Sequence, residues 1–119
     1  MKYICLVHFE DRAFGALSQD QLREMDRRSL AYDEALKSSG HLIHAEALQS
    51  PKSAVLVQRR NGEASTRAGP LIDAKEQLGG FILIEARDLD EAVQIAAGIP
   101  LAELGTIEVR PIFEVAAPG

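Results

Sequence analysis

The chain has 119 residues, of which 46% are hydrophobic and 26% are charged, and these values are typical of one globular domain. We therefore expect a single domain at residues 1–119. The formal charge of −5 argues against a nucleic-acid partner, which needs a basic stripe for phosphate contacts. Because a domain of this size leaves much of its surface exposed, pairing with a second copy would help its stability.

Two N-terminal features bear on the location of the protein. Residues 1–7 contain one basic residue, a short apolar stretch and no small-residue cleavage signal, and no later segment approaches the roughly 18 apolar residues of a membrane span. The single cysteine, Cys5, has no partner for an internal disulfide and lies in an apolar run, so we expect it to be buried. These features predict a cytoplasmic protein without a membrane partner.

The first half of the chain predicts a strand, a helix and a strand. Residues 2–9 are apolar in both period-two phases, as in a central strand with both faces covered, and residues 10–15 form a loop. Ser18 and Gln21 make a capping-box pattern for a helix at residues 19–39, which ends at Gly40. Residues 42–48 form the next strand. The helix face that packs on the sheet consists of Leu22, Met25, Ser29, Tyr32 and Leu36.

The second half begins with a predicted hairpin. Residues 54–58 alternate as a strand after a break at Pro51, and Asn61-Gly62 is a strong signal for a type I′ turn into a short strand at residues 63–67. Residues 68–80 form a polar connection to a strand at residues 81–86.

A second helix and a last strand complete the chain. Asp88 and Glu91 repeat the capping pattern, and the helix ends at Gly98 before Pro100. Residues 107–113 alternate as a strand. The whole order predicts an α+β, ferredoxin-like fold with an inserted β-hairpin. The predicted buried stripe of the second helix consists of Leu89, Ala92, Val93 and Ala96.

Three segments resemble a known family. They are AGPLIDAKEQLGGF at residues 68–81, IEARDLDEA at residues 84–92 and IEVRP at residues 107–111. Together they look like the DGPF branch of the YCII-related family, and the resemblance covers nearly the whole chain. The longest ordered matches are KEQLGG at residues 75–80 and EVRP at residues 108–111.

The resemblance implies a dimeric ferredoxin-like α+β barrel, and therefore a homodimer. It also implies a cleft in which many members carry a His and an Asp, the basis for an enzymatic function in the family. Some relatives in the wider family resemble dehalogenases of chlorinated muconolactone-type lactones. Members of the DGPF branch are often associated with alternative sigma factors. The resemblance implies no single reaction for this branch.

The chain departs from the family pattern at three positions. Ala68 and Leu71 stand where the naming tetrapeptide has Asp and Phe. A gapless alignment back from Gly40 places Ser29 where dehalogenase-type members would carry their His. The acid/base residue that the resemblance implies is therefore absent from that position.

His8 is the first candidate catalytic residue, because it ends a central strand next to a polar loop. A histidine beside a carboxylate can act as a general base with its tautomer fixed by the acid. By strand alternation, Glu10 shares the face of His8 and Asp11 does not. The alternative is a partly exposed histidine at a strand end.

Polar residues on two other strands provide further candidates. His44 and Glu46 share one face of their strand, and Glu108 and Arg110 form a polar pair on the last strand. In a dimer of sheet faces, His44 as a catalytic group and Arg110 as a ligand-binding group would line an intersubunit cleft for a small molecule. Alternatively, these side chains are solvated or pair across the interface.

The connection before residue 81 carries Asp73, Lys75 and Glu76. Lys75 is suited to hold an anionic ligand and Asp73 to accept a hydrogen bond from one, and Glu10 and Ser29 join them as candidate ligand-binding residues. The alternative is a loop or dimer contact held by salt links. His41 and His44 fall on opposite faces, and the Gly69-Pro70 and Gly79-Gly80 pairs lack the order of a P-loop, so we expect no metal site and assign the glycine pairs to turns.

Three functions remain open at this point. The first is acid/base chemistry on, or binding of, a small organic acid or lactone without a bound cofactor. The second is a non-catalytic interaction or regulatory module in sigma-factor-type transcription control, favoured by Ser29, Ala68 and Leu71. The third, a cofactor-free oxygenase, rests on analogy of architecture alone, and six aromatic residues are few for an aromatic-substrate pocket.

Overall fold

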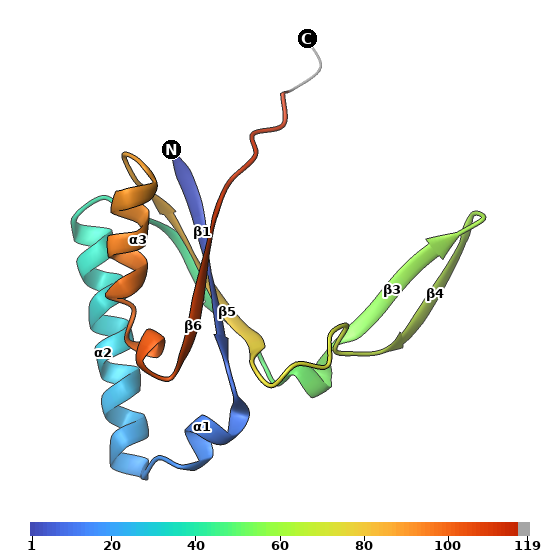
Figure 1. Ribbon diagram of the computed structural model, residues 1–119, viewed down its shortest axis with the longest axis horizontal. Helices are drawn as coiled ribbons and strands as arrows, with labels where there is room; N and C mark the ends of the chain where they lie inside the picture. The colour runs from blue at the N-terminus through green and yellow to red at the C-terminus, as the bar shows by residue number, and fades with distance from the viewer. Residues whose placement is uncertain (117–119) are drawn as a thin grey trace.

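Four antiparallel strands form the central sheet of the computed structural model, which describes residues 1–116 (Figure 1). They are β1 (Lys2–Phe9), β2 (Leu42–Ala47), β5 (Gln77–Glu85) and β6 (Gly105–Pro111), in the order β2-β5-β1-β6. Helices α2 (Gln19–Ser38) and α3 (Leu89–Ala97) lie together on one face of this sheet. The ferredoxin-like α+β fold predicted from the sequence is confirmed. We call the face without α2 and α3 the open face.

The core lies between this sheet and the two helices. Its least exposed large side chains are Tyr3, Cys5 and Ile84. Cys5 is 0% exposed, as its apolar surroundings predicted, and burial raises the pKa of its thiol to about 11. The thiol is therefore neutral and serves as a small core side chain.

The beginning of α2 is fixed by the predicted capping box. The Ser18 hydroxyl accepts a hydrogen bond from the Gln21 amide at 3.1 Å, and the Gln21 side chain accepts one from the Ser18 amide at 2.8 Å. Met25 and Leu36 are buried on the face that points to the sheet. Gly40 follows the helix with φ +82°, a conformation that suits glycine.

The buried face of α3 differs from the predicted one. The Asp88 carboxylate caps the helix by accepting from the Glu91 amide at 2.9 Å. Leu89 and Val93, however, are 51% and 50% exposed, so their predicted burial is wrong. The buried residues have the helical spacing i, i+3, i+4 and i+7 and extend past the end of the helix; they are Ala92, Ile95, Ala96 and Ile99.

Two segments predicted as loops have regular structure. Residues 11–15 form the short helix α1 (Asp11–Gly15), whose Phe14 ring packs edge-on against Phe9 with 4.7 Å between centroids. Residues 77–80 belong to β5, so the assignment of Gly79 and Gly80 to a turn is wrong. A side chain at Gly79 would clash with the Phe9 ring, and one at Gly80 would lie 2.8 Å from the Glu46 carbonyl oxygen. These glycines permit close packing within the sheet.

The strands β3 (Val55–Arg60) and β4 (Glu63–Ala68) form a separate two-stranded sheet, which we call the arm. Asn61 and Gly62 have φ of 52° and 78°, which confirms the predicted turn. In Figure 1 the arm projects away from the sheet on the side opposite α2 and α3. Short 3-10 helices, Pro51–Ser53 and Pro100–Glu103, precede the arm and β6. No helix within residues 1–116 is long and apolar enough to cross a membrane.

The Ile84→Ala substitution tests the assigned core. Ile84 is 0% exposed, so the variant loses buried methyl groups and leaves a cavity, and we expect it to cost about 2–5 kcal/mol of unfolding free energy. Val93→Ala is the matched control at a half-exposed site on α3, with an expected change within about 0.5 kcal/mol. Urea unfolding measures both changes. Equal effects of the two substitutions would contradict this core.

Candidate functional site

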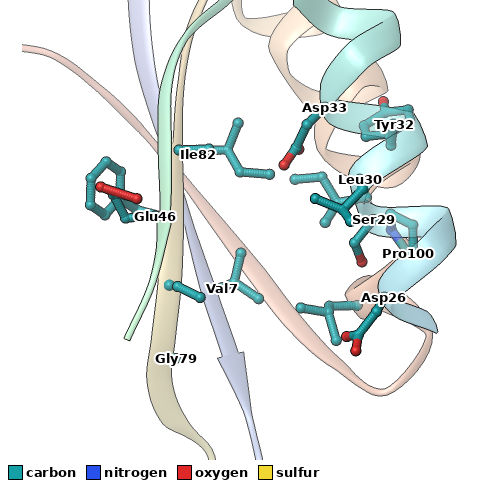
Figure 2. A pocket seen from close by; sticks show the side chains of 16 residues that line it. Val7, Asp26, Ser29, Leu30, Tyr32, Asp33, Glu46, Gly79, Ile82 and Pro100 are labelled. Atoms are coloured by element: carbon teal, nitrogen blue, oxygen red, sulfur yellow. The ribbon is translucent and has the colours of Figure 1, made fainter. Parts of the chain in front are cut away.

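A cleft of about 450 Å³ lies between α2, the sheet and the 3-10 helix Pro100–Glu103 (Figure 2). We call it the α2 cleft. Its volume is within the range of sites that bind small organic molecules. Most of its wall is apolar, with side chains from the sheet, α2 and the 3-10 segment: Val7, Leu30, Ala45, Ile82, Ile99 and Pro100.

Three polar side chains of α2 face this cleft. Asp26, Ser29 and Asp33 have the spacing i, i+3 and i+7, which places them on one side of the helix. Figure 2 shows Ser29 and Asp33 pointing from α2 toward the sheet, while Glu46 points to the other side of its strand. No Lys, Arg or His occurs among the described residues that line the cleft. The cleft therefore presents hydroxyl and carboxyl groups on an apolar background.

Asp33 has an altered acidity. Burial raises the pKa of its carboxyl above the usual value, and the negative charge of Glu34 raises it further. A carboxyl group with a raised pKa in a cleft is a candidate acid or base. Asp26 and Asp33 were not predicted as site residues, because the apolar residues of an amphipathic helix indicate its buried face and acidic residues are expected in solvent. Their helical spacing around Ser29 was the available signal.

Tyr32 forms part of the wall rather than a reactive group. Its hydroxyl donates a hydrogen bond to the Ile95 carbonyl at 2.6 Å, and burial raises its pKa. Because the hydroxyl proton is used in this bond, Tyr32 is unavailable as a proton donor to a ligand. The bond joins α2 to α3 and holds one side of the cleft in place.

His8 lies on the open face and contacts a carboxylate from a neighbouring strand. Its Nε2 is 3.1 Å from Glu108 Oε1, and the two strands β1 and β6 are hydrogen-bonded neighbours. Glu10 instead accepts a hydrogen bond from Arg12 at 3.0 Å. The acid that orients the histidine is therefore Glu108 and not the expected Glu10.

The other histidine candidate also lies on the open face. His44 Nε2 is 3.3 Å from Glu46 Oε2, which agrees with their predicted shared strand face, and its ring centroid is 6.0 Å from that of Phe81. Arg110 is paired with Ile4 in the register of β6 and β1 and shares the face of Glu108. The structure thus places Ser29 in the α2 cleft and places His8, His44 and Arg110 across the sheet from it.

A second hollow, of about 680 Å³, lies between His8 and the base of the arm. Glu76 lines it, whereas Asp73 and Lys75 do not. Near these residues, the Gln77 amide donates to the carbonyl oxygens of Ile72 at 2.7 Å and Ala74 at 2.9 Å. These bonds come from the Gln77 amide, and within residues 1–116 Asp73, Lys75 and Glu76 form no salt bridge, so the expected salt links are not observed.

The histidines of β2 and its preceding turn do not form a metal centre. His41 Nε2 lies 3.3 Å from Glu91 on α3, whereas His44 pairs with Glu46 on the open face. Within residues 1–116, no three His, Cys, Asp or Glu side chains are close enough together to hold a metal ion.

Comparison with known proteins identifies the family. The family model for the YCII-related domain matches residues 1–116, and the chain belongs to this family. An uncharacterised protein of Rhizobium meliloti (strain 1021) is 30% identical over 114 residues, which cover 94% of this chain and 92% of that protein.

One similar solved structure is 5-chloro-2-hydroxyhydroquinone dehydrochlorinase (TftG) from Burkholderia phenoliruptrix AC1100, in complex with 2,5-dihydroxybenzoquinone. The TM-score is 0.58, the identity is 18%, and the match covers 97% of this chain and 96% of that one. At this identity the likeness establishes the fold. Assignment to the DGPF branch stays a prediction from the sequence.

The Asp33→Asn substitution tests the raised pKa. Since the folded state holds the Asp33 proton more tightly than the unfolded state, this contribution to stability is complete below the unfolded pKa, about 3.9, and is lost as pH rises through the folded pKa. The amide cannot ionise, so the variant escapes this loss and is the more stable protein at pH 7. Thermal unfolding from pH 3 to pH 7 measures the difference.

The Glu34→Gln variant provides the matched control for this pH series. It retains Asp33 and removes the neighbouring charge, so the loss of stability moves to lower pH instead of disappearing. Parallel stability curves for the wild type and Asp33→Asn would show that the carboxyl is not shifted.

Proposed function

We propose that the protein is a small-molecule enzyme that performs acid/base chemistry in the α2 cleft, with Asp33 as the group that exchanges the proton. The observation that carries this proposal is a carboxyl of raised pKa in an apolar cleft of about 450 Å³. A general base works best when its pKa lies near the working pH, and a raised carboxyl pKa moves in that direction. No cofactor is part of the proposed step.

The similar solved structure of TftG supports acid/base chemistry in the α2 cleft. That protein is a dehydrochlorinase of 5-chloro-2-hydroxyhydroquinone, and its bound compound is 2,5-dihydroxybenzoquinone. Both compounds are small rings with ionisable hydroxyl groups. We therefore propose a hydroxylated ring or a lactone as the substrate class of this chain.

The charge of the cleft favours a substrate that is neutral when it binds. Asp26 and Asp33 are acidic, and the described lining contains no basic side chain. An organic acid would enter without a cationic partner and would lose hydration energy. Among the candidates named above, a neutral lactone or hydroxyhydroquinone-type ring thus fits better than an organic acid.

Each polar side chain of α2 in the cleft has a separate role in this proposal. Ionised Asp33 accepts a proton from a hydroxyl or an acidic C–H group of the ring, and returns it later in the cycle. Ser29 supplies a hydroxyl that holds the ring by a hydrogen bond, in place of the histidine that the family resemblance implies there. Asp26 lies one turn earlier and discriminates against anionic compounds.

A homodimer formed through the open face is part of the same proposal. The residues of β1 and β5 on this face include partly exposed apolar side chains: Ile4, Leu6, Phe81 and Leu83. Burial of such a face against a second copy removes apolar surface from water. The pairs His8–Glu108 and His44–Glu46, together with Arg110, then lie at the interface and not in the α2 cleft.

Asp33→Asn is the central test of function. We expect purified protein to bind hydroxyquinol, handled without oxygen, or an uncharged muconolactone-type ester, and to bind benzoate more weakly. For a ring that turns over, Asp33→Asn lowers the rate by about 10²–10⁴-fold while the dissociation constant changes little. Calorimetry measures binding, and proton nuclear magnetic resonance in heavy water measures turnover as deuterium exchange at the carbon from which Asp33 removes the proton.

The control variant is Asp90→Asn, which removes an exposed carboxyl on α3 far from the cleft lining and leaves the rate unchanged. Equal rates for Asp33→Asn and the wild type would overturn the catalytic role of Asp33. Absence of binding by every ring and lactone would overturn the enzyme proposal and leave the interaction module in sigma-factor-type control as the better reading.

A further inference from the structure

The arm at residues 55–68 has little internal support for its exposed position. Its strands pair only with each other, in six residue pairs from Val55–Ala68 to Arg60–Glu63. An isolated two-stranded hairpin is marginally stable in water at best. Every residue of β4 is exposed, and on β3 only Leu56 is partly covered.

One surface of the arm is apolar and bare. Val55 and Val57 lie on the same face of β3 by strand alternation, and they are 66% and 67% exposed. β-branched residues are favoured in strands because they pack well against neighbouring side chains. Leaving both in water forgoes that packing, so this surface is suited to contact another molecule.

The charge of the arm is opposite to that of the rest of the chain. It carries Arg59, Arg60 and Arg67 against one acid, Glu63, so its formal charge is +2, whereas the whole chain has −5. Among the described residues none of these arginines forms a salt bridge. A basic arm and an acidic body are complementary between two copies of the same chain.

The body offers a matching acidic group on α2. Glu34 is exposed, lies outside the lining of the α2 cleft and forms no salt bridge among the described residues. Two further acids of α2, Asp20 and Glu24, already form ion pairs with arginines of the same helix. The helix side of a second copy therefore presents free negative charge to a basic partner.

The length and direction of the arm allow it to reach that side. Six residues of β3 span about 20 Å at roughly 3.3 Å per residue. Two sheets packed face to face lie about 10 Å apart. The arm projects on the open-face side (Figure 1), and because its span exceeds the spacing of two packed sheets, it is long enough to pass the sheet of a copy packed on that face.

From these observations we infer that the arm is a clamp that holds a second copy of this chain. Its Val55 and Val57 surface packs along the partner, and Arg59, which lies on the same face nearer the tip, meets Glu34 on α2 of the second copy. The inference extends the homodimer of the proposed function but does not depend on the acid/base chemistry of Asp33. A nucleic acid is a poorer occupant, because the body beside the arm is acidic and repels phosphate.

Two arm variants test the clamp in the full-length protein by sedimentation velocity. Val55→Ser with Val57→Ser removes the apolar contact, and Arg59→Glu reverses the charge on the same face of the arm. We expect each of these variants to raise the dimer dissociation constant about tenfold or more. The wild-type constant also rises with salt, while the charge-reversed variant loses this salt dependence.

Matched controls separate the arm from general effects. Val115→Ser removes an exposed valine outside the arm, and Arg12→Glu makes the same change in net charge outside the arm and α2. Both controls keep the wild-type dissociation constant. Unchanged circular dichroism and thermal unfolding of each monomer confirm that the body remains folded.

A third variant, which lacks the arm, tests the clamp even where an arm with substitutions still holds the second copy. Replacing residues 56–67 with a short Gly-Ser turn removes the arm, and we expect a folded and largely monomeric protein. An arm-free protein that dimerises as tightly as the wild type would overturn the clamp, as would a wild type that is monomeric at all concentrations. A monomeric arm-free protein would support the clamp. Ring binding in the α2 cleft of that monomer then tests the proposed function separately.

Discussion

Both long helices pack on the same face of the four-stranded sheet, and this constraint determines the chemistry of the two faces. On the helix side, alternate residues such as Tyr3, Cys5 and Ile84 form the core with α2 and α3. On the open face, the intervening residues meet solvent or another molecule. Because the central strands carry apolar side chains on both faces, the open face is not an ordinary solvent-exposed surface.

The α2 cleft arises where this packing is incomplete. Met25 and Leu36 anchor α2 over the sheet, and between them the helix presents Ser29 and Asp33 instead of large apolar side chains. The space that such side chains would fill remains open as the cleft. The same replacement places a carboxyl in partly buried surroundings, which raises its pKa and destabilises its ionised form. A group that costs stability where it is ionised is typical of a functional site.

Local signals predicted much of the fold. Ser18, Gln21 and Asp88 fixed the helix beginnings because capping depends on a few neighbouring residues, and Asn61-Gly62 fixed the hairpin for the same reason. Features that depend on distant residues were missed. Gly79 looks like a turn residue until Phe9, far away in the sequence, is seen to cover it. The face of α3 depends on Ile99, which lies beyond the helix.

The candidate site was harder to predict for a related reason. His8 and His44 were predicted as site residues because histidine is a common acid/base group. In the structure they contact Glu108 and Glu46 on the open face, away from the α2 cleft. The helix periodicity placed Ser29 toward the sheet, and the family resemblance made it a site candidate. Asp33 is an ordinary surface acid until the sheet is packed against α2. Strand β5 then connects the two regions, since Ile82 lines the cleft while its neighbours Phe81 and Leu83 lie on the open face. A second copy held on that face would therefore press on the back of the strand that forms the cleft wall, so assembly and ligand binding share one structural element.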